Sequence, residues 1–197
     1  LIAGWISSHP DVTAAVLLAD PFSENSHEIV HWLLGNQAEN GFISSYWWRG
    51  PLYCTTFLLR ALNLMQHPLK EEWVVKLRRG ASQLPLVNGK YIFDHDSSVD
   101  AFHTALALET FTYIDKQQAA RESCQALLDL QQPDGSWQGG LNMRIPAPFI
   151  IHPEDISSWN NADGGGNSLI DDKNGLFATA IACYALDQWR KSAIQDL

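Results

Sequence analysis

Residues 131–137 read Gln131-Gln132-Pro133-Asp134-Gly135-Ser136-Trp137, which is the pattern Gln-x-x-x-Gly-x-Trp at the end of a predicted helix. A shorter form, Gln-x-x-x-Gly followed by Phe, occupies residues 37–42 at the end of an earlier predicted helix. In this pattern the glutamine can cap the helix end, the glycine permits a left-handed exit, and an aromatic ring can cover the turn. The recurrence predicts a repeated corner at which helices end.

Helices account for most of the chain around these corners. Apolar residues recur at spacings of three and four in seven stretches, which Gly-, Pro- and Asn-rich breaks separate. Pro51 suits a first helical turn, and Ser98 suits a helix cap. No segment alternates as a strand does, so the predicted fold class is all-α. The predicted helices cover residues 11–19, 24–37, 51–65, 69–83, 98–114, 117–131 and 175–194.

Four of these helices share a threonine that is followed by small and apolar residues. The threonines are Thr13, Thr55, Thr104 and Thr179, which lie 42, 49 and 75 positions apart. Each interval also contains another predicted helix. The repeating unit is therefore a helix pair of about 40 residues, with longer loops inserted in the later pairs.

The composition excludes several classes of protein. With 46% hydrophobic and 18% charged residues, 197 residues suffice for one domain with a substantial core. The net charge of −9 leaves no basic stripe for a nucleic acid, and no apolar run approaches the roughly 18 residues of a membrane span. Cys54, Cys124 and Cys183 follow no metal-binding spacing, which favours reduced thiols in a cytoplasmic protein.

The corner and the threonine helices together resemble one family. Gln131-x-x-x-Gly135-x-Trp137 resembles the QW motif of squalene and oxidosqualene cyclases, and the threonine helices resemble the paired repeats of the terpene cyclase and protein prenyltransferase superfamily. The resemblance spans nearly the whole chain. It implies an α/α toroid, or barrel, whose inner helices line a central apolar cavity.

The size of the chain bears on this toroid. The resemblance implies six helix pairs in a closed toroid, and twelve helices with their loops need well over 197 residues. We therefore expect residues 1–197 to form a single toroid domain that is a fragment of a longer chain. A missing N-terminal segment or a second chain would complete the toroid.

A candidate reaction site follows from the repeat. The positions two residues before the four threonines hold one carboxyl group and three aromatic rings. If these helices are the inner ones, the four side chains share one layer of the cavity. A carboxylic acid can protonate an alkene or epoxide, and aromatic faces can stabilise the resulting carbocation. The residues are Asp11, Tyr53, Phe102 and Phe177, and for the three rings the alternative is ordinary helix packing.

Asp11 is the candidate general acid. Asp11-Val12-Thr13-Ala14 resembles the Asp-Cys-Thr-Ala of oxidosqualene cyclases, in which the Asp donates the proton. The resemblance implies the same role for Asp11, and burial in an apolar cavity would raise its pKa as that role requires. Two alternatives stay open, which are an N-cap and a carboxylate that supports another acid.

Further side chains complete the candidate site. We expect Trp47 or Trp48 to face the cavity, with surface stacking as the alternative. His103 is expected to be a hydrogen-bonded histidine in the cavity or at a helix end. Arg49 and Arg144 are expected to be exposed surface charges, and binding of a substrate carboxylate is the alternative.

The resemblance implies a class II terpene cyclase, most similar to the single-domain cyclases of the merosterolic acid synthase type. Such an enzyme closes rings in a small apolar isoprenoid, here a prenylated aromatic acid. Proton-initiated chemistry needs no cofactor and no metal. We expect a cytoplasmic protein that makes peripheral contact with a membrane.

Two other functions fit parts of the sequence. Phe102-His103-Thr104 resembles the Tyr-His-Thr that carries the zinc-binding histidine of prenyltransferase β-subunits, and Cys54 shares its repeat position with His103. However, Leu52 and Ala178 stand where that family has Asp and His. The third function is a non-catalytic repeat domain that binds a partner or an apolar ligand in its groove.

Overall fold

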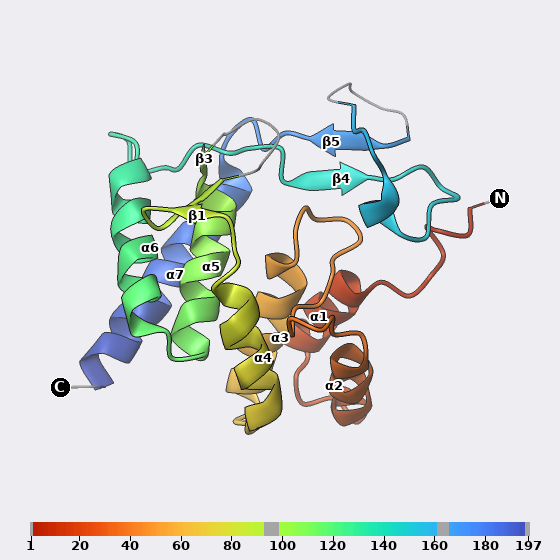
Figure 1. Ribbon diagram of the computed structural model, residues 1–197, viewed down its shortest axis with the longest axis horizontal. Coiled ribbons are helices and arrows are strands. Elements are labelled where there is room, and N and C mark those ends of the chain that lie inside the picture. The colour runs from red at the N-terminus through yellow and green to blue at the C-terminus, as the bar shows by residue number, and fades with distance from the viewer. Residues whose placement is uncertain (1, 93–98, 161–165, 196–197) are drawn as a thin grey trace. The chain divides into compact units, whose positions relative to one another are not determined.

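The computed structural model describes residues 2–92, 99–160 and 166–195, and it is rich in helices (Figure 1). All seven predicted helices are present in the described residues, with ends within a few residues of the prediction. The cap predicted at Ser98 lies outside the described residues. The helices are α1 (Pro10–Ala19), α2 (Ser26–Gly35), α3 (Leu52–Leu64), α4 (Glu71–Ala81), α5 (Ala101–Tyr113), α6 (Gln117–Leu130) and α7 (Leu176–Gln195).

The expectation that the chain lacks strands is wrong. Two small antiparallel sheets are present, one with the order β1-β2-β3 and one made of β4 and β5. Each strand has only two or three residues, which is too short for an alternating pattern to show in the sequence. The strands are β1 (Leu86–Val87), β2 (Lys90–Ile92), β3 (Val99–Asp100), β4 (Met143–Ile145) and β5 (Ser168–Ile170).

The described chain divides into two compact units. Unit 1 consists of Leu1–Ala38, Phe42–Pro68 and Leu141–Asp171, and it contains α1 to α3 with β4 and β5. Unit 2 consists of Glu39–Gly41, Leu69–Gly140 and Asp172–Leu197, and it contains α4 to α7 with β1 to β3. The single toroid domain over residues 1–197 stays a prediction.

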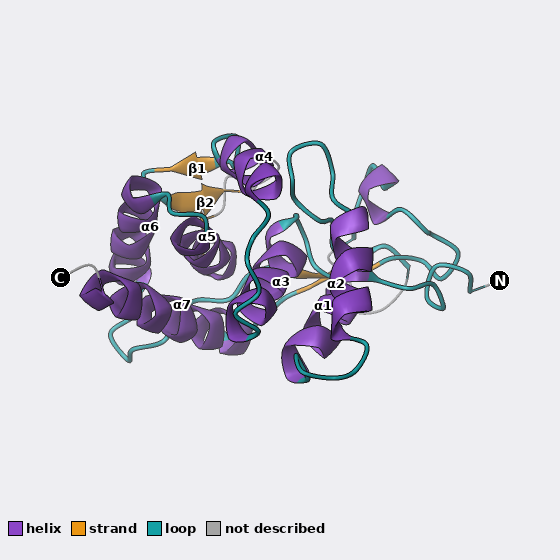
Figure 2. Cartoon of the chain, turned by 90° about the horizontal axis from the view of Figure 1, so that it is seen from below, coloured by secondary structure: helices purple, strands orange, loops and turns teal. Residues whose placement is uncertain are grey.

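In unit 2, the burial of each helix explains its position. Every residue of α5 from Ala101 to Phe111 is buried, and α5 packs against α6, α7 and β2 (Figure 2). In α6 only Ala120, Ser123, Ala126 and Leu127 are buried, a stripe along one face that is typical of a helix at the surface. The pair of α5 and α6 thus combines a buried helix with one at the surface of unit 2.

In unit 1, α1 packs against α2 and α3. Nine of the thirteen residues of α3 are buried, whereas α2 buries only Ser26, Val30 and Leu33. Unit 1 therefore repeats the combination of a largely buried helix with an amphipathic one. No helix in the described ranges is long and apolar enough to cross a membrane.

The corners have the predicted geometry, with one difference. Gly41 and Gly135 adopt φ values of 83° and 89°, the left-handed conformation that glycine tolerates best. Trp137 is buried and donates its indole N–H to the carbonyl of Leu127 at 2.7 Å. Whereas Gln37 caps the end of α2, the side chain of Gln131 donates instead to the carbonyl of Gly135 across the turn, at 2.9 Å.

Candidate functional site around Asp11

The Asp11 carboxyl group is buried at the start of α1, where 1% of the residue is exposed. His9 is the N-cap and Pro10 the first helical residue, so the N-cap alternative for Asp11 is wrong. Its Oδ2 accepts the backbone N–H groups of Tyr46 at 2.9 Å and Trp47 at 2.7 Å. Its Oδ1 accepts the N–H of Val12 at 3.1 Å. Asp11 thus holds Tyr46 and Trp47, in the segment that leads into α3.

Burial and hydrogen bonds act on Asp11 in opposite directions. Loss of solvent raises the pKa of the carboxyl group, and the backbone N–H groups of Trp47, Val12, Tyr46 and Asp11 itself lower it by stabilising the charged form. Burial is the larger effect, so the pKa of Asp11 lies above its ordinary value of 3.8. Because Oδ2 accepts two of the bonds and Oδ1 only one, a proton on this group is better placed on Oδ1.

Near this carboxyl group, two aromatic rings of α3 stack with a ring from the segment before the helix. The Tyr53 ring lies between Trp48, at 4.4 Å between centroids, and Phe57, at 4.1 Å. The guanidinium of Arg60 lies 4.8 Å from the centroid of the Phe57 ring. Burial, with a smaller contribution from the negative charge of Asp11, raises the pKa of Tyr53 to about 12. Tyr53 is therefore a neutral phenol near pH 7.

Trp47 belongs to a second aromatic cluster. The His9 ring stacks on Tyr46 at 3.8 Å, and the Trp47 ring meets Tyr46 at 4.8 Å and His9 at 5.6 Å. Trp5 approaches Trp47 at 6.1 Å. The His9 Nε2 atom is buried and has no hydrogen-bond partner in the part of the chain that the structure describes. Beside this cluster is a pocket of about 270 Å³, lined by residues 7–10, Asn36, residues 44–46 and 151–154.

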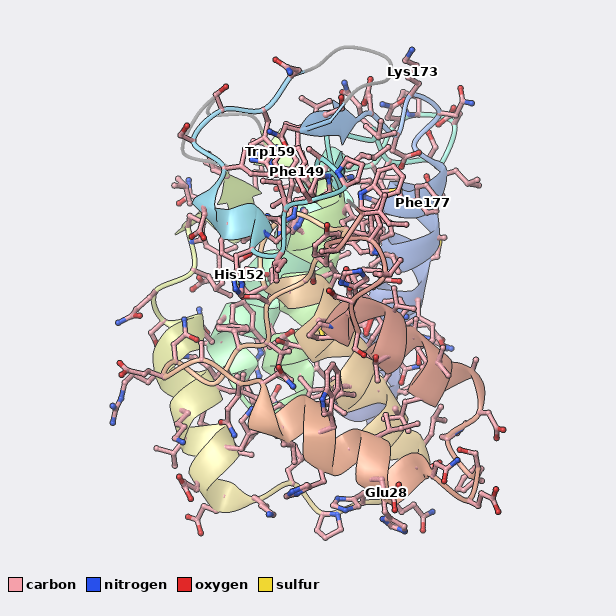
Figure 3. All side chains as sticks on the ribbon, turned by 90° about the vertical axis from the view of Figure 1, so that its right-hand side faces the viewer. Glu28, Phe149, His152, Trp159, Lys173 and Phe177 are labelled. Atoms are coloured by element: carbon pink, nitrogen blue, oxygen red, sulfur yellow. The ribbon has the colours of Figure 1, made fainter. Side chains whose placement is uncertain are left out.

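The expectation of an exposed Arg144 is wrong, since only 9% of the residue is exposed. Its Nε donates to the carbonyl of Tyr46 at 3.0 Å, and its Nη2 donates to the carbonyl of Ser45. Its guanidinium also lies 3.8 Å from Glu154 and 5.6 Å from the centroid of the Trp159 ring. Trp159 is on the segment between β4 and β5 (Figure 3). Asp11 and Arg144 thus hold the same segment, residues 45–47. Asp11 accepts its backbone N–H groups, and Arg144 donates to its carbonyls.

The remaining predicted site residues belong to unit 2. Phe102 is buried and meets the His103 ring at 5.2 Å between centroids. His103 is fully buried at the start of α5, where its backbone N–H and its Nδ1 lie 2.7 Å and 3.1 Å from Asp100 Oδ1. It is thus bonded at a helix end. Phe177 lies at the start of α7 (Figure 3), and 44% of the residue is exposed.

The predicted site residues therefore fall into two sets. Asp11, Trp47, Trp48 and Tyr53 belong to unit 1, whereas Phe102, His103 and Phe177 belong to unit 2. The single layer shared by all of them stays a prediction. Two residues of the zinc hypothesis are divided in the same way, with Cys54 in unit 1 and His103 in unit 2. In the described ranges no three His, Cys, Asp or Glu residues are grouped closely enough to hold a metal ion.

The sequence analysis did not identify Phe57 and His9 as parts of this site, and it did not predict that Arg144 is buried against the carbonyls of Ser45 and Tyr46. Phe57 follows Tyr53 by four residues, a spacing that places both rings on one face of α3 and is visible in the sequence. His9 and Arg144 carry no such signal. Arg144 reaches carbonyls that are 98 and 99 residues away along the chain, so only the folded structure shows its role.

No protein-family model and no curated protein matches the chain. Solved structures do match, and several of them are structures of a type II terpene cyclase, so the predicted resemblance to class II terpene cyclases is confirmed. The named example is MstE from Scytonema, with 25% identity and a TM-score of 0.83 over 97% of this chain and 58% of that one. A protein from Actinoplanes has 26% identity and a TM-score of 0.83 over 95% and 57%.

Two more findings complete the comparison. The ent-copalyl diphosphate synthase from Streptomyces platensis has a TM-score of 0.60 at 18% identity, over 91% of this chain and 33% of that one, and shares the fold alone. Other MstE structures hold geranylgeranyl dihydroxybenzoate as substrate and merosterolic acid A as product. The chain spans less than two thirds of the length of the Actinoplanes protein and of MstE.

Proposed function

We propose that the protein is a class II terpene cyclase, which protonates a polyprenyl chain and closes its rings through carbocations. The observation that carries the proposal is the buried Asp11 carboxyl group, with its raised pKa, near the stacked rings of Trp48, Tyr53 and Phe57. An acid that is protonated more readily than an exposed aspartate, close to π-faces, has the features that this reaction needs. The structural similarity to MstE supports the same class of reaction.

In the proposed first step, Asp11 donates the proton on Oδ1 to the terminal alkene of the substrate. The O–H bond breaks, the π electrons form a new C–H bond, and the positive charge develops on the adjacent carbon. The N–H groups of Tyr46 and Trp47 stabilise the carboxylate that is left behind. Further alkenes attack the cation, and a base removes a proton at the end. The product is therefore an isomer of the substrate.

We assign the aromatic residues to the wall of the cavity. Tyr53, Trp48 and one face of Trp47 would stabilise the early cation, and Phe102 and Phe177 would line the path of the later ones. With a pKa of about 12, Tyr53 keeps its proton at neutral pH and offers a neutral ring. His103 would line the cavity at the start of α5 and contact the substrate, held in place by its bonds to Asp100.

We propose a prenylated aromatic acid as the substrate, because MstE binds geranylgeranyl dihydroxybenzoate. No metal or other cofactor takes part in the proposed chemistry. The proposed enzyme is a toroid of helix pairs, of which residues 1–197 form one part. We further propose a cytoplasmic enzyme that contacts a membrane at its surface, where Ile6 and Phe149 of unit 1 expose most of their side chains.

The test is conversion of geranylgeranyl dihydroxybenzoate by the full-length protein and by two matched variants. Asp11→Asn keeps the shape of the side chain but removes the acid, and it should lower the rate of cyclisation by about 10²- to 10⁴-fold. Asp20→Asn changes an exposed aspartate just after the same helix and should leave the rate unchanged. A folded Asp11→Asn variant with the wild-type rate would remove Asp11 from the mechanism. No cyclised product from any prenylated acid would contradict the proposed function.

A further inference from the structure

The proposed reaction leaves the Asp11 carboxyl group without its proton after each cycle. The proton that Asp11 gives to the alkene stays on carbon in the product, so the acid must be protonated again before the next substrate can react. Only 1% of Asp11 is exposed, so bulk solvent has little direct access to the carboxyl group. A neighbouring group that carries protons from the solvent would solve this problem.

His9, the N-cap of α1, is close to this carboxyl group. The His9 ring stacks on the Tyr46 ring at 3.8 Å, with 27° between the ring planes, and it meets the edge of Trp47 at 5.6 Å. Tyr46 and Trp47 are the two residues whose backbone N–H groups bond to Asp11 Oδ2. The imidazole ring and the carboxyl group therefore contact the same two residues.

The Nε2 atom of His9 has an unmet hydrogen-bonding capacity. Only 8% of the residue is exposed, and Nε2 is buried without a partner among the described residues. Buried polar atoms in folded proteins are nearly always bonded to protein or to ordered water. Since no described residue bonds to Nε2, we expect a water molecule there.

The pocket of about 270 Å³ provides the space for such water. His9 lines it together with Pro10 and Tyr46, which are the residue before Asp11 and one of its hydrogen-bond donors. Most of the other lining residues are polar and exposed, so the pocket leads from the surface of unit 1 to the imidazole ring. These exposed polar residues are Ser7, Ser8, Asn36, Ser44, His152 (labelled in Figure 3) and Glu154.

We propose, on the basis of the proposed function, that His9 returns the proton to Asp11 through water in this pocket. After the product has left, protonated His9 gives the proton on Nε2 to a water molecule, which gives one of its own protons to Asp11 Oδ1. The N–H bond breaks, the O–H bond of the carboxyl group forms again, and His9 takes up a proton from the solvent. One proton thus enters at Asp11 for each proton that leaves at the end of cyclisation, and no other reactant is consumed.

The chemistry of the pocket fits proton return better than binding of the substrate's acid group. Asp11 protonates the terminal alkene, which is at the opposite end of a polyprenyl chain from the aromatic acid. A pocket whose walls include Pro10 and Tyr46 is therefore at the wrong end of the substrate for that group. Imidazole suits the proposed role, because it can accept a proton on one nitrogen and release one from the other near neutral pH.

The test separates the first turnover from the later ones. The full-length protein is mixed rapidly with an excess of geranylgeranyl dihydroxybenzoate, and the product is measured over time. His9→Phe keeps a ring against Tyr46 but cannot carry a proton. It should form one product per enzyme at the wild-type rate and then slow by about 10²-fold or more, because the acid is no longer reloaded. The control His31→Phe removes an exposed histidine of α2 outside the pocket and should behave as wild type.

His9→Ala is the second variant, and it leaves space for a small ring beside Tyr46. Added imidazole should restore its later turnovers, whereas thiophene, a ring of similar size that takes up no proton, should not. Restoration by both rings would overturn the proposal, because the ring would then act only by packing.

Two results of the turnover measurement would also overturn the proposal. One is a wild-type rate of later turnovers in both His9 variants. The other is an equal loss of rate in the first and the later turnovers of folded variants, because His9 would then affect proton donation and not its return. Both results leave the proposed function standing. The absence of product from the wild type would instead overturn the proposed function, and proton return by His9 with it.

Discussion

The Asp11 carboxyl group is held by three backbone N–H groups and still has a pKa above its ordinary value. Hydrogen bonds of this kind usually favour the charged carboxylate and lower its pKa. The pKa of Asp11 is nevertheless raised, because burial of the carboxyl group has the larger effect. The same three bonds would stabilise the conjugate base once the proton has left. At the scale of one residue, the geometry thus supports both the presence of the proton and its transfer.

The raised pKa of Asp11 gives stability a defined dependence on pH. The folded protein binds a proton on Asp11 at pH values where the unfolded chain has already lost it. The free energy of unfolding should therefore fall as pH rises from 3.8 through the raised pKa, by up to about 1.4 kcal/mol per pH unit from this group. Urea unfolding at a series of pH values measures the slope. Asp11→Asn should flatten it relative to Asp20→Asn, and equal slopes in the two variants would contradict the shift.

Arg144 should matter for stability through its two bonds to carbonyls. Arg144→Met keeps the aliphatic stem and leaves the Ser45 and Tyr46 carbonyls without this donor. We expect the free energy of unfolding to fall by about 2–4 kcal/mol. The matched control is Arg121→Met, at an exposed position on α6, which should change stability by about 0.5 kcal/mol or less. Equal stability of the two variants would show that the bonds from Arg144 to the Ser45 and Tyr46 carbonyls do not stabilise the fold.

Tyr53 should act through its ring and not through its hydroxyl group. Tyr53→Phe keeps the ring that lies between Trp48 and Phe57 and should retain most of the cyclisation rate. Tyr53→Leu removes the π-face, and a lost cation–π contact of about 2 kcal/mol lowers the rate by about 30-fold. Steady-state rates, with Tm measured to verify folding, distinguish the two. A Tyr53→Phe variant as slow as Tyr53→Leu would assign the effect to the hydroxyl group.

At the scale of elements, turns decide where each helix and strand stops. Asn88 and Gly89 join β1 to β2 with φ values of 50° and 77°, which is the two-residue hairpin that suits an Asn-Gly pair. A Cβ atom on Gly89 would lie 2.3 Å from the carbonyl oxygen of Glu122 on α6. The glycine therefore satisfies both a backbone conformation and a close approach between two elements.

This geometry gives a prediction with an internal control. Gly89→Ala should destabilise the protein by about 2 kcal/mol or more, because it strains the turn and pushes β2 away from α6. Gly35→Ala, at the end of α2, meets no atom within 4 Å and should be neutral or stabilising by up to about 1 kcal/mol. Urea unfolding compares the two. A Gly89→Ala protein as stable as Gly35→Ala would refute the close contact.

The same scale shows what the sequence could and could not predict. Helices of ten or more residues carry a clear apolar period, so all seven were predictable. The left-handed conformation of the corner glycines was predictable from the Gln-x-x-x-Gly pattern. Strands of two or three residues carry no period. The pairing of β4 with β5 depends on contacts such as Arg144 with Leu169, which are 25 residues apart and leave no local pattern.

At the scale of the whole molecule, the site was predictable in part. The repeat identified Asp11 and Tyr53 as equivalent positions, and both are in unit 1. Residues distant in sequence help to hold Asp11 in place, because two of the three N–H groups on its carboxyl come from positions 35 and 36 residues away. Such long-range contacts are a product of folding, and local spacing does not encode them.

The most direct test of the account is cyclisation in heavy water. The full-length protein is incubated with geranylgeranyl dihydroxybenzoate in D₂O, and the product is analysed by mass spectrometry. Protonation by Asp11, whose carboxyl proton exchanges with solvent, predicts an isomer of the substrate that carries one deuterium at the protonated carbon. Asp11→Asn should form none. A cyclised product without deuterium would contradict proton-initiated cyclisation, and a deuterated product formed by Asp11→Asn at the wild-type rate would contradict the role of Asp11.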